Sequence, residues 1–220
     1  MIQVPWISYE DIEIEAQKVL VEYGKNIRRI ETPPVPVENI IEKLFGLQLE
    51  LDDVRGRGFG PDALGCLYIK RKKIIIDSSL EYIEGRYHFT CGHELGHWWL
   101  HREWFLQWKK QLSMLPEKDE PLVICRESEK RLRREQQADR FAAALLMPKK
   151  LVLAVLQEKH VDLNPIFTDE TLRYWGITKE EYCRKVASQY NRIFGVSVQA
   201  MQIRLDELGL LKQEVNQMLL

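Results

Sequence analysis

Apolar residues recur every three or four positions in several long stretches of the chain, a spacing that predicts amphipathic helices. In the first stretch, Ser8 is a good N-cap with Asp11 three positions later, and the apolar residues from Ile12 to Tyr23 fall on one helical face. The same spacing predicts four further helices: one from about Glu84 to beyond His101, one over Glu127–Met147, and two over Lys179–Ile193 and Ser197–Leu208.

Three shorter stretches have the pattern of β-strands, and a short helix precedes them. Val37–Phe45 has the spacing of that helix, and a glycine follows it directly. Leu47–Leu51 alternates apolar and polar residues like a half-buried strand, and Cys66–Ile69 and Ile74–Asp77 flank a basic turn, which predicts a hairpin. This order predicts an α+β fold, mostly helical, with a small sheet beside the helix that follows it.

The two C-terminal helices are separated by the turn Phe194–Val196, with Ser197 as an N-cap and Gly209 as a C-cap. Helix, tight turn and helix is the shape of a DNA-reading module, but such pairs also pack against a neighbouring domain or a partner. The second helix carries few cations that would bind phosphate. Packing is therefore the favoured interpretation, and direct DNA binding stays the alternative.

The composition is that of a globular protein. Of the 220 residues, 45% are hydrophobic and 30% are charged, and a net charge of −1 gives no general electrostatic attraction to nucleic acid. Cys66, Cys91, Cys125 and Cys183 are scattered without a CxxC pair, so we expect reduced thiols in a cytoplasmic protein. The N-terminus lacks the pattern of a signal peptide, and no apolar run reaches the length of a membrane span.

The strongest candidate for chemistry is the segment His93-Glu94-Leu95-Gly96-His97. Residues four apart lie on one face of a helix, so both imidazoles can point at a single metal ion. Glu94, next to a ligand, can take the proton of a water that the ion activates. Zinc suits this chemistry because it brings the pKa of a bound water towards neutrality and polarises a carbonyl. A five-residue pattern with two free positions also arises by chance, so its interpretation depends on context.

That context supplies a third ligand, since catalytic zinc usually has three from the protein. In the predicted helix Glu127–Met147, Glu135 and Asp139 lie four residues apart on an otherwise apolar face. Two buried carboxylates without partners would be costly. We therefore expect Glu135 to be the third ligand and Asp139 to accept the free ring N–H of a ligating histidine. The basic run over residues 130–134 is expected on the solvated face of this helix.

With these two segments in place, the chain resembles the ImmA/IrrE family of zinc metallo-endopeptidases. His93–His97 and Glu135–Pro148 are similar to the paired active-site motifs of that family. One segment differs, because Glu103–Arg126 looks longer than its counterpart in a typical member. Further similar segments extend over most of the chain: Pro33–Glu38, Arg86–Thr90, His101, Phe194–Ser197, Arg204–Leu205 and Leu208–Leu210.

The resemblance implies a gluzincin-type zinc site. His93, His97 and Glu135 would bind zinc. Glu94 would be the general base and acid, and Asp139 would support His93. Members of the family typically cleave helix-turn-helix repressors and so switch on stress-response or mobile-element genes. The implied partner is therefore a protein substrate of that kind.

The expected organisation is a zincin-like metallopeptidase domain over residues 1–160, followed by a C-terminal helical, helix-turn-helix-like region over residues 161–220. In the enzyme class that the motif resembles, an edge strand beside the zinc helix pairs with an extended substrate backbone, and Gly65–Ile69 is our candidate for that strand. Tyr68 and His101 are candidates for contacts with the substrate or the transition state, although each also suits a packing role.

Three hypotheses follow for the function. The first is a zinc endopeptidase that cuts a regulatory protein. The second is a transcriptional regulator that binds DNA or a repressor and has a purely structural zinc site, and the third is a chance HExxH in a helical protein. An open coordination position and a usable Glu94 distinguish the first from the second, and Glu135 with Asp139 argues against the third. The donors also suit Mn²⁺ or Fe²⁺, so zinc is the expectation drawn from the motif.

Overall fold

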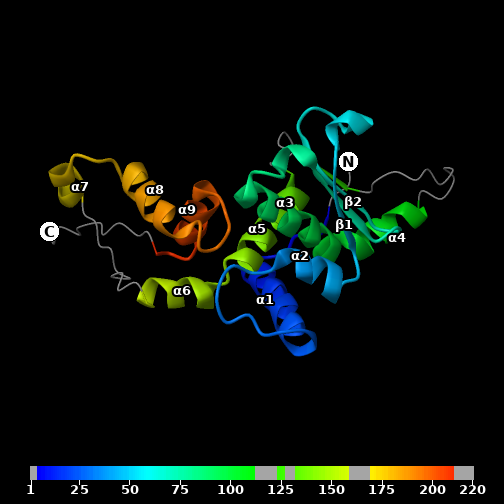
Figure 1. Cartoon of the computed structure of the whole chain (residues 1–220), viewed down its shortest axis with the longest axis horizontal. Coiled ribbons are helices and arrows are strands. Elements are labelled where there is room, and N and C mark those ends of the chain that lie inside the picture. Colours follow the sequence, from blue (N-terminus) through cyan, green and yellow to red (C-terminus); the bar gives the residue numbers. More distant parts are fainter. Residues whose placement is uncertain (1–3, 112–122, 127–131, 159–168, 211–220) are drawn as a thin grey trace. The chain divides into compact units, whose positions relative to one another are not determined.

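The chain divides into two compact units in the computed structural model: Met1–Ile30 with Val35–Leu146, and Glu31–Pro34 with Met147–Leu220. The structure describes residues 4–111, 123–126, 132–158 and 169–210 (Figure 1). The predicted α+β class is confirmed, because helices dominate both units and the strands form one small sheet. The predicted domain boundary at residue 160 lies outside the described residues and stays a prediction.

The first unit contains the sheet and the helices around it. Its strands are β1 (Gln48–Asp52), β2 (Ala63–Tyr68), β3 (Lys73–Asp77) and β4 (Val123–Arg126). Its helices and helical turns are α1 (Tyr9–Asn26), α2 (Val37–Asn39), η1 (Ile40–Leu44), η2 (Arg55–Phe59), η3 (Ser78–Leu80), α3 (Glu84–Gly96), η4 (His97–His101), α4 (Arg102–Gln111) and α5 (Arg133–Leu146).

The first predicted helix is confirmed in its cap and in its buried face. The backbone N–H of Asp11 donates to the Ser8 hydroxyl at 3.0 Å, which satisfies one of the free donors at the start of α1. Apolar side chains at helical spacing from Ile12 to Tyr23 are buried. α1 packs against α5, so this face forms part of the core behind the ligand helix.

The sheet has the strand order β1-β3-β2-β4. β2 and β3 form the predicted antiparallel hairpin, and β1 runs parallel to β3. β4 pairs with the other side of β2, antiparallel, with Leu67 opposite Val123. The prediction that Gly65–Ile69 is an edge strand is therefore wrong, because β2 has a neighbour on each side. β4 comes from the long segment Glu103–Arg126, and a pairing between such distant parts of the chain leaves no trace in local periodicity.

The helix that carries the HExxH segment continues through α3, η4 and α4, which confirms its extension beyond His101. One turn, η4, is π-helical, a widening that is common at functional sites. α5 begins at Arg133 and ends before Pro148, as expected from the restriction that proline places on the preceding residue. The predicted beginning of that helix at Glu127 lies outside the described residues.

Small residues let α3 and α5 approach closely. A Cβ added to Gly92 would lie 3.2 Å from the Cβ of Ala142, and one added to Gly96 would lie 3.2 Å from both the Cα and the carbonyl oxygen of Ala138. The two glycines are four residues apart on α3, and the two alanines are four residues apart on α5, so each pair lies on one helical face. The two faces meet along one line of contact. On its other side α3 contacts β2 and β3 (Figure 1). The motif helix is thus held between the sheet and α5.

The second unit is helical where it is described, with α6 (Lys149–Glu158), α7 (Asp169–Trp175), α8 (Lys179–Tyr190) and α9 (Val198–Glu207). The predicted pair of C-terminal helices is confirmed, and Ser197 caps α9 by accepting from the Ala200 N–H at 3.1 Å. The buried Arg204 donates from Nε to the Met147 carbonyl at 3.0 Å, which ties α9 to the start of the unit.

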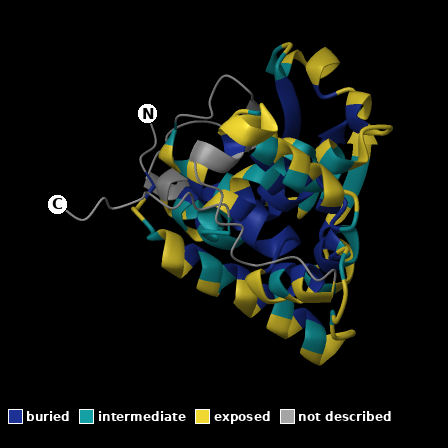
Figure 2. Ribbon diagram, turned by 90° about the vertical axis from the view of Figure 1, so that its left-hand side faces the viewer, coloured by how far each residue is buried: buried dark blue, intermediate teal, exposed yellow. Residues whose placement is uncertain are grey.

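Burial follows the faces that the sequence predicts. Buried residues gather on the inward faces of the helices and in the strands, and exposed residues cover the outward faces (Figure 2). β2 is buried along its whole length. In the described part of the chain, no helix combines the length and the hydropathy that a membrane span requires.

Candidate metal centre

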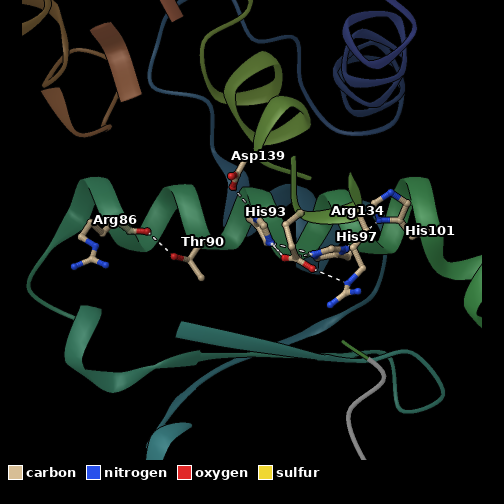
Figure 3. A network of polar contacts seen from close by, with 8 residues as sticks. Arg86, Thr90, His93, His97, His101, Arg134 and Asp139 are labelled. Atoms are coloured by element: carbon tan, nitrogen blue, oxygen red, sulfur yellow. Dashed lines mark hydrogen bonds and ion pairs between the residues drawn. The ribbon is translucent and has the colours of Figure 1, made fainter. Parts of the chain in front are cut away.

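Two helices bring together the three predicted ligand side chains. His93 lies in the last turn of α3, His97 follows it directly, and Glu135 lies in the first turn of α5. Glu135 Oε2 is 3.1 Å from His93 Nε2 and 3.3 Å from His97 Nε2, and the two Nε2 atoms are 3.0 Å apart (Figure 3). All three side chains are buried. The three donor atoms therefore converge on one point.

Asp139 lies where the sequence predicted it, behind the first histidine. Its Oδ1 is 2.8 Å from His93 Nδ1, one turn of α5 beyond Glu135 (Figure 3). A carboxylate only accepts, so Nδ1 of His93 carries the proton and Nε2 keeps its lone pair towards the centre. The Asp139 side chain is 39% exposed, so its carboxyl group has access to water.

The environment of Glu135 includes a residue that sequence reasoning missed. The Nε of Arg134 is 2.8 Å from Glu135 Oε1, and the Arg134 side chain is 16% exposed (Figure 3). The expectation that the basic run 130–134 forms a solvated face is therefore wrong for Arg134. Burial raises the pKa of Glu135, but the charges and hydrogen bonds of His97 and His93 outweigh it and hold the pKa well below its usual range. Glu135 is thus ionised.

His101 is the polar residue that follows on the same helix, and it is buried. Its Nδ1 is 3.0 Å from His97 Nδ1, and its Nε2 is 2.9 Å from Oε1 of the Gln137 side-chain amide. Burial, with a smaller contribution from the neighbouring His97, lowers the pKa of His101 to about 3, so its ring is neutral. Both ring nitrogens are engaged inside the protein, and a contact of His101 with a substrate stays a prediction.

Tyr68, the other candidate for a substrate contact, lies at the end of β2. Its side chain is 8% exposed, and the guanidinium carbon of Arg71 is 5.6 Å from the centroid of its ring. Burial raises the pKa of the Tyr68 hydroxyl, and the nearby Cys66 adds to the shift. A role in substrate binding stays a prediction for Tyr68.

Glu94 is the unusual group in this centre. It is fully buried, and neither of its carboxylate oxygens has a hydrogen-bond partner among the described residues. It faces β2 at Gly65, where an added Cβ would lie 2.9 Å from Glu94 Oε1 and would force the carboxylate to shift. Burial, partly opposed by His93 and aided by Glu135, raises the pKa of Glu94 to about 8. A buried carboxylate without a partner is costly, so the arrangement serves something other than stability.

The donor set fits a divalent transition-metal ion. His93, His97 and Glu135 offer two imidazole nitrogens and one carboxylate oxygen within 4.8 Å of one another. Two imidazole lone pairs at 3.0 Å repel each other unless a proton or a cation lies between them. An ion would remove that conflict and would also compensate the unpartnered carboxylate of Glu94. The buried group His93-His97-Glu135 is therefore able to bind a metal.

One comparison with known proteins matches the part of the chain that carries the α5 residues of this centre. Residues 123–206 match the model of the peptidase M78 family, described as IrrE N-terminal-like domain, which confirms the predicted resemblance to the ImmA/IrrE family. The match includes Glu135 and Asp139 but begins after His97. A solved structure of a Mycobacterium tuberculosis transcriptional regulator is similar over 81% of this chain, with 15% identity and a TM-score of 0.44. The chain spans 46% of the length of that protein. A search of curated proteins finds no match.

Glu94→Gln is expected to stabilise the metal-free protein at neutral pH. The pKa of Glu94 rises from 4.5 to about 8 on folding. Ionisation of Glu94 therefore lowers the free energy of unfolding as the pH rises from 4.5 to about 8. An amide escapes this penalty but is itself buried without partners, which leaves a net gain of roughly 1–3 kcal/mol at pH 7. Urea unfolding of both metal-free proteins at pH 5 and pH 8 measures the difference between their free energies of unfolding, which should be larger at pH 8. A difference of equal size at both pH values would contradict the burial argument.

Proposed function

We propose that this chain is a zinc-dependent endopeptidase that hydrolyses a peptide bond in a regulatory protein, most simply a helix-turn-helix repressor. The observation that carries the proposal is the buried, unpartnered carboxylate of Glu94 beside three converging donor atoms. A hydrolase needs a proton carrier at this place, and a purely structural metal site does not. The match to an IrrE N-terminal-like domain supports a peptidase of this kind.

His93, His97 and Glu135 would hold the ion, and Asp139 would keep the His93 ring in the orientation and tautomer that binding requires. A bound zinc ion supplies a Lewis acid, which polarises the scissile carbonyl and makes the attacking water more acidic. Arg134 pairs with Glu135, and its positive charge offsets part of the negative charge that Glu135 brings into this buried region.

Glu94 carries the proton through the reaction. Its carboxylate accepts a proton from the attacking water as the new C–O bond forms, and it then gives that proton to the amine nitrogen as the C–N bond breaks. Its two oxygens have no competing donor among the described residues, so they are available for this transfer. The neighbouring Gly65 leaves the space that the carboxylate occupies between α3 and β2.

The second function, a regulator with a structural zinc site, is less well supported. Structural zinc is usually closed by four protein ligands, whereas three donor atoms converge here among the residues that the structure describes. α8 and α9 have the order of a helix-turn-helix, but such pairs occur widely without DNA. A repressor as the substrate rests on the resemblance to the ImmA/IrrE family and on the matching domain at residues 123–206.

Cleavage of a repressor that depends on the metal tests the proposal. The zinc-loaded chain is incubated with a panel of purified helix-turn-helix repressors, and products are identified by mass spectrometry. We expect one repressor to be cut at a defined bond, cleavage to stop after chelation, and cleavage to return when zinc is added back. Fragments that form equally in the chelated sample would assign the activity to a contaminant, and intact repressors throughout would contradict the proposed substrate class.

A further inference from the structure

A chain of hydrogen bonds leads from the candidate metal centre to the backbone near the N-terminus. His97 Nδ1 is 3.0 Å from His101 Nδ1, and His101 Nε2 is 2.9 Å from Gln137 Oε1. The amide nitrogen of Gln137 lies 3.0 Å from the carbonyl oxygen of Pro5. The side chains of His97, His101 and Gln137 are at most 3% exposed, so water has little access to these bonds.

The hydrogen bond between the Gln137 amide and the Pro5 carbonyl fixes which atom donates in each of the other hydrogen bonds. The Pro5 carbonyl can only accept, so the amide N–H of Gln137 donates to it and the amide oxygen faces His101. That oxygen also only accepts, so His101 carries its proton on Nε2 and presents a lone pair at Nδ1. His97 must then donate from Nδ1, which leaves its Nε2 lone pair directed at Glu135 and His93.

The other proton arrangements fail on simple grounds. A proton on Nε2 of His97 would require His101 to donate from Nδ1, and the Nε2 lone pair of a neutral His101 would then face the Gln137 oxygen. Rotating the amide would place its oxygen against the Pro5 carbonyl. A doubly protonated His101 would put a cation in a buried region, which is costly. With a neutral His101, one arrangement satisfies all three bonds.

We propose that His101 and Gln137 are positioning residues that hold His97 as the tautomer whose Nε2 can bind a metal, with the Pro5 carbonyl as the anchor. The inference rests on the proposed role of His97 as a metal ligand, but not on peptidase activity. It also distinguishes the two histidines. His93 is oriented by a partly exposed carboxylate, whereas His97 is oriented by the buried side chains of His101 and Gln137.

The tautomer can be read directly in the metal-free protein. Imidazole ¹⁵N chemical shifts separate a protonated nitrogen from one that carries a lone pair, so the labelled chain should show His97 with its proton on Nδ1 and His101 with its proton on Nε2. The opposite assignment for either ring would overturn the proposal. This measurement needs neither a bound metal nor a substrate, so it stays decisive even if the proposed peptidase function fails.

Zinc affinity tests the same chain by substitution. His101→Phe keeps an aromatic ring but removes the acceptor for His97, and we expect about 10–100-fold weaker zinc binding. Gln137→Met should also weaken zinc binding, because it removes both the acceptor for His101 and the donor to the Pro5 carbonyl. Competition with a chromogenic chelator gives the constants. Zinc affinity unchanged in both His101→Phe and Gln137→Met would refute the positioning role.

A packing variant separates hydrogen bonding from simple stability. The ring of Phe105 lies edge-on to His101 with centroids 6.0 Å apart, and Phe105 is 1% exposed. Phe105→Leu should therefore lower the melting temperature while leaving zinc affinity within about threefold of the unchanged chain. A loss of zinc affinity in Phe105→Leu as large as that in His101→Phe would show that packing alone explains the effect.

Discussion

Glu94→Gln should lower the rate of peptide hydrolysis by about 10²–10⁴-fold while zinc stays bound. The amide has nearly the same shape as the carboxylate, and Glu94 is not among the three converging donor atoms, so the ligands keep their geometry. What is lost is the group that accepts a proton from water and returns it to the leaving amine. The measurement is the rate of repressor cleavage with metal content determined on the same samples.

A matched control comes from the first turn of the same helix. Glu84 is exposed, so Glu84→Gln makes the same chemical change at a place where no role in the reaction is expected. Its cleavage rate should equal that of the unchanged chain. Equal rates for Glu94→Gln and the unchanged chain would remove Glu94 from the reaction and leave the structural zinc hypothesis as the better one.

Glu135→Ala should release the metal, with zinc affinity lower by more than about 100-fold. Partners of ligands usually contribute 10–100-fold to metal affinity, so the loss of a ligand itself should exceed that range. The substitution also leaves the two imidazoles and Arg134 without their carboxylate, which removes the charge that balances a cation in this buried region. Metal analysis after gel filtration and a chelator competition give the content and the affinity. Hydrolysis should fall together with metal content.

The next residue on the same helix provides the control. Gln136 is exposed, so Gln136→Ala changes α5 by a similar amount without touching the donor atoms. We expect it to bind zinc as the unchanged chain does. Should Glu135→Ala keep its zinc, the third ligand must be another group, and the assignment of the centre to His93, His97 and Glu135 would be wrong.

Local patterns were sufficient to predict most elements and the members of the centre. The spacing of the two histidines and of Glu135 and Asp139 is a property of single helices, and it places each pair on one face before any tertiary contact is known. The cap at Ser8 and the β2–β3 hairpin are also local, and both are confirmed. Features of this kind depend on residues a few positions apart.

What the sequence analysis missed depends on contacts between distant segments. Gln137 lies two residues after Glu135, but its role requires His101 and Pro5, which lie in other parts of the chain. Arg134 belongs to a basic run that favours a solvated face, and only the position of Glu135 shows why its side chain is covered. The Gly92–Gly96 and Ala138–Ala142 pairs could have been found, because small residues at matching spacing on two helices are a packing signal.

Because β2 is paired on both sides, an extended segment of another protein can join it beside the motif helix only by taking over the partners that β4 now has. β4 belongs to the same chain, so its effective concentration beside β2 is high. An incoming peptide must bind β2 strongly enough to replace β4. A substrate would succeed through stronger side-chain contacts or through a strand presented in a rigid form. If the proposed peptidase activity holds, flexible peptides of unrelated proteins would fail to replace β4, and those proteins would escape cleavage.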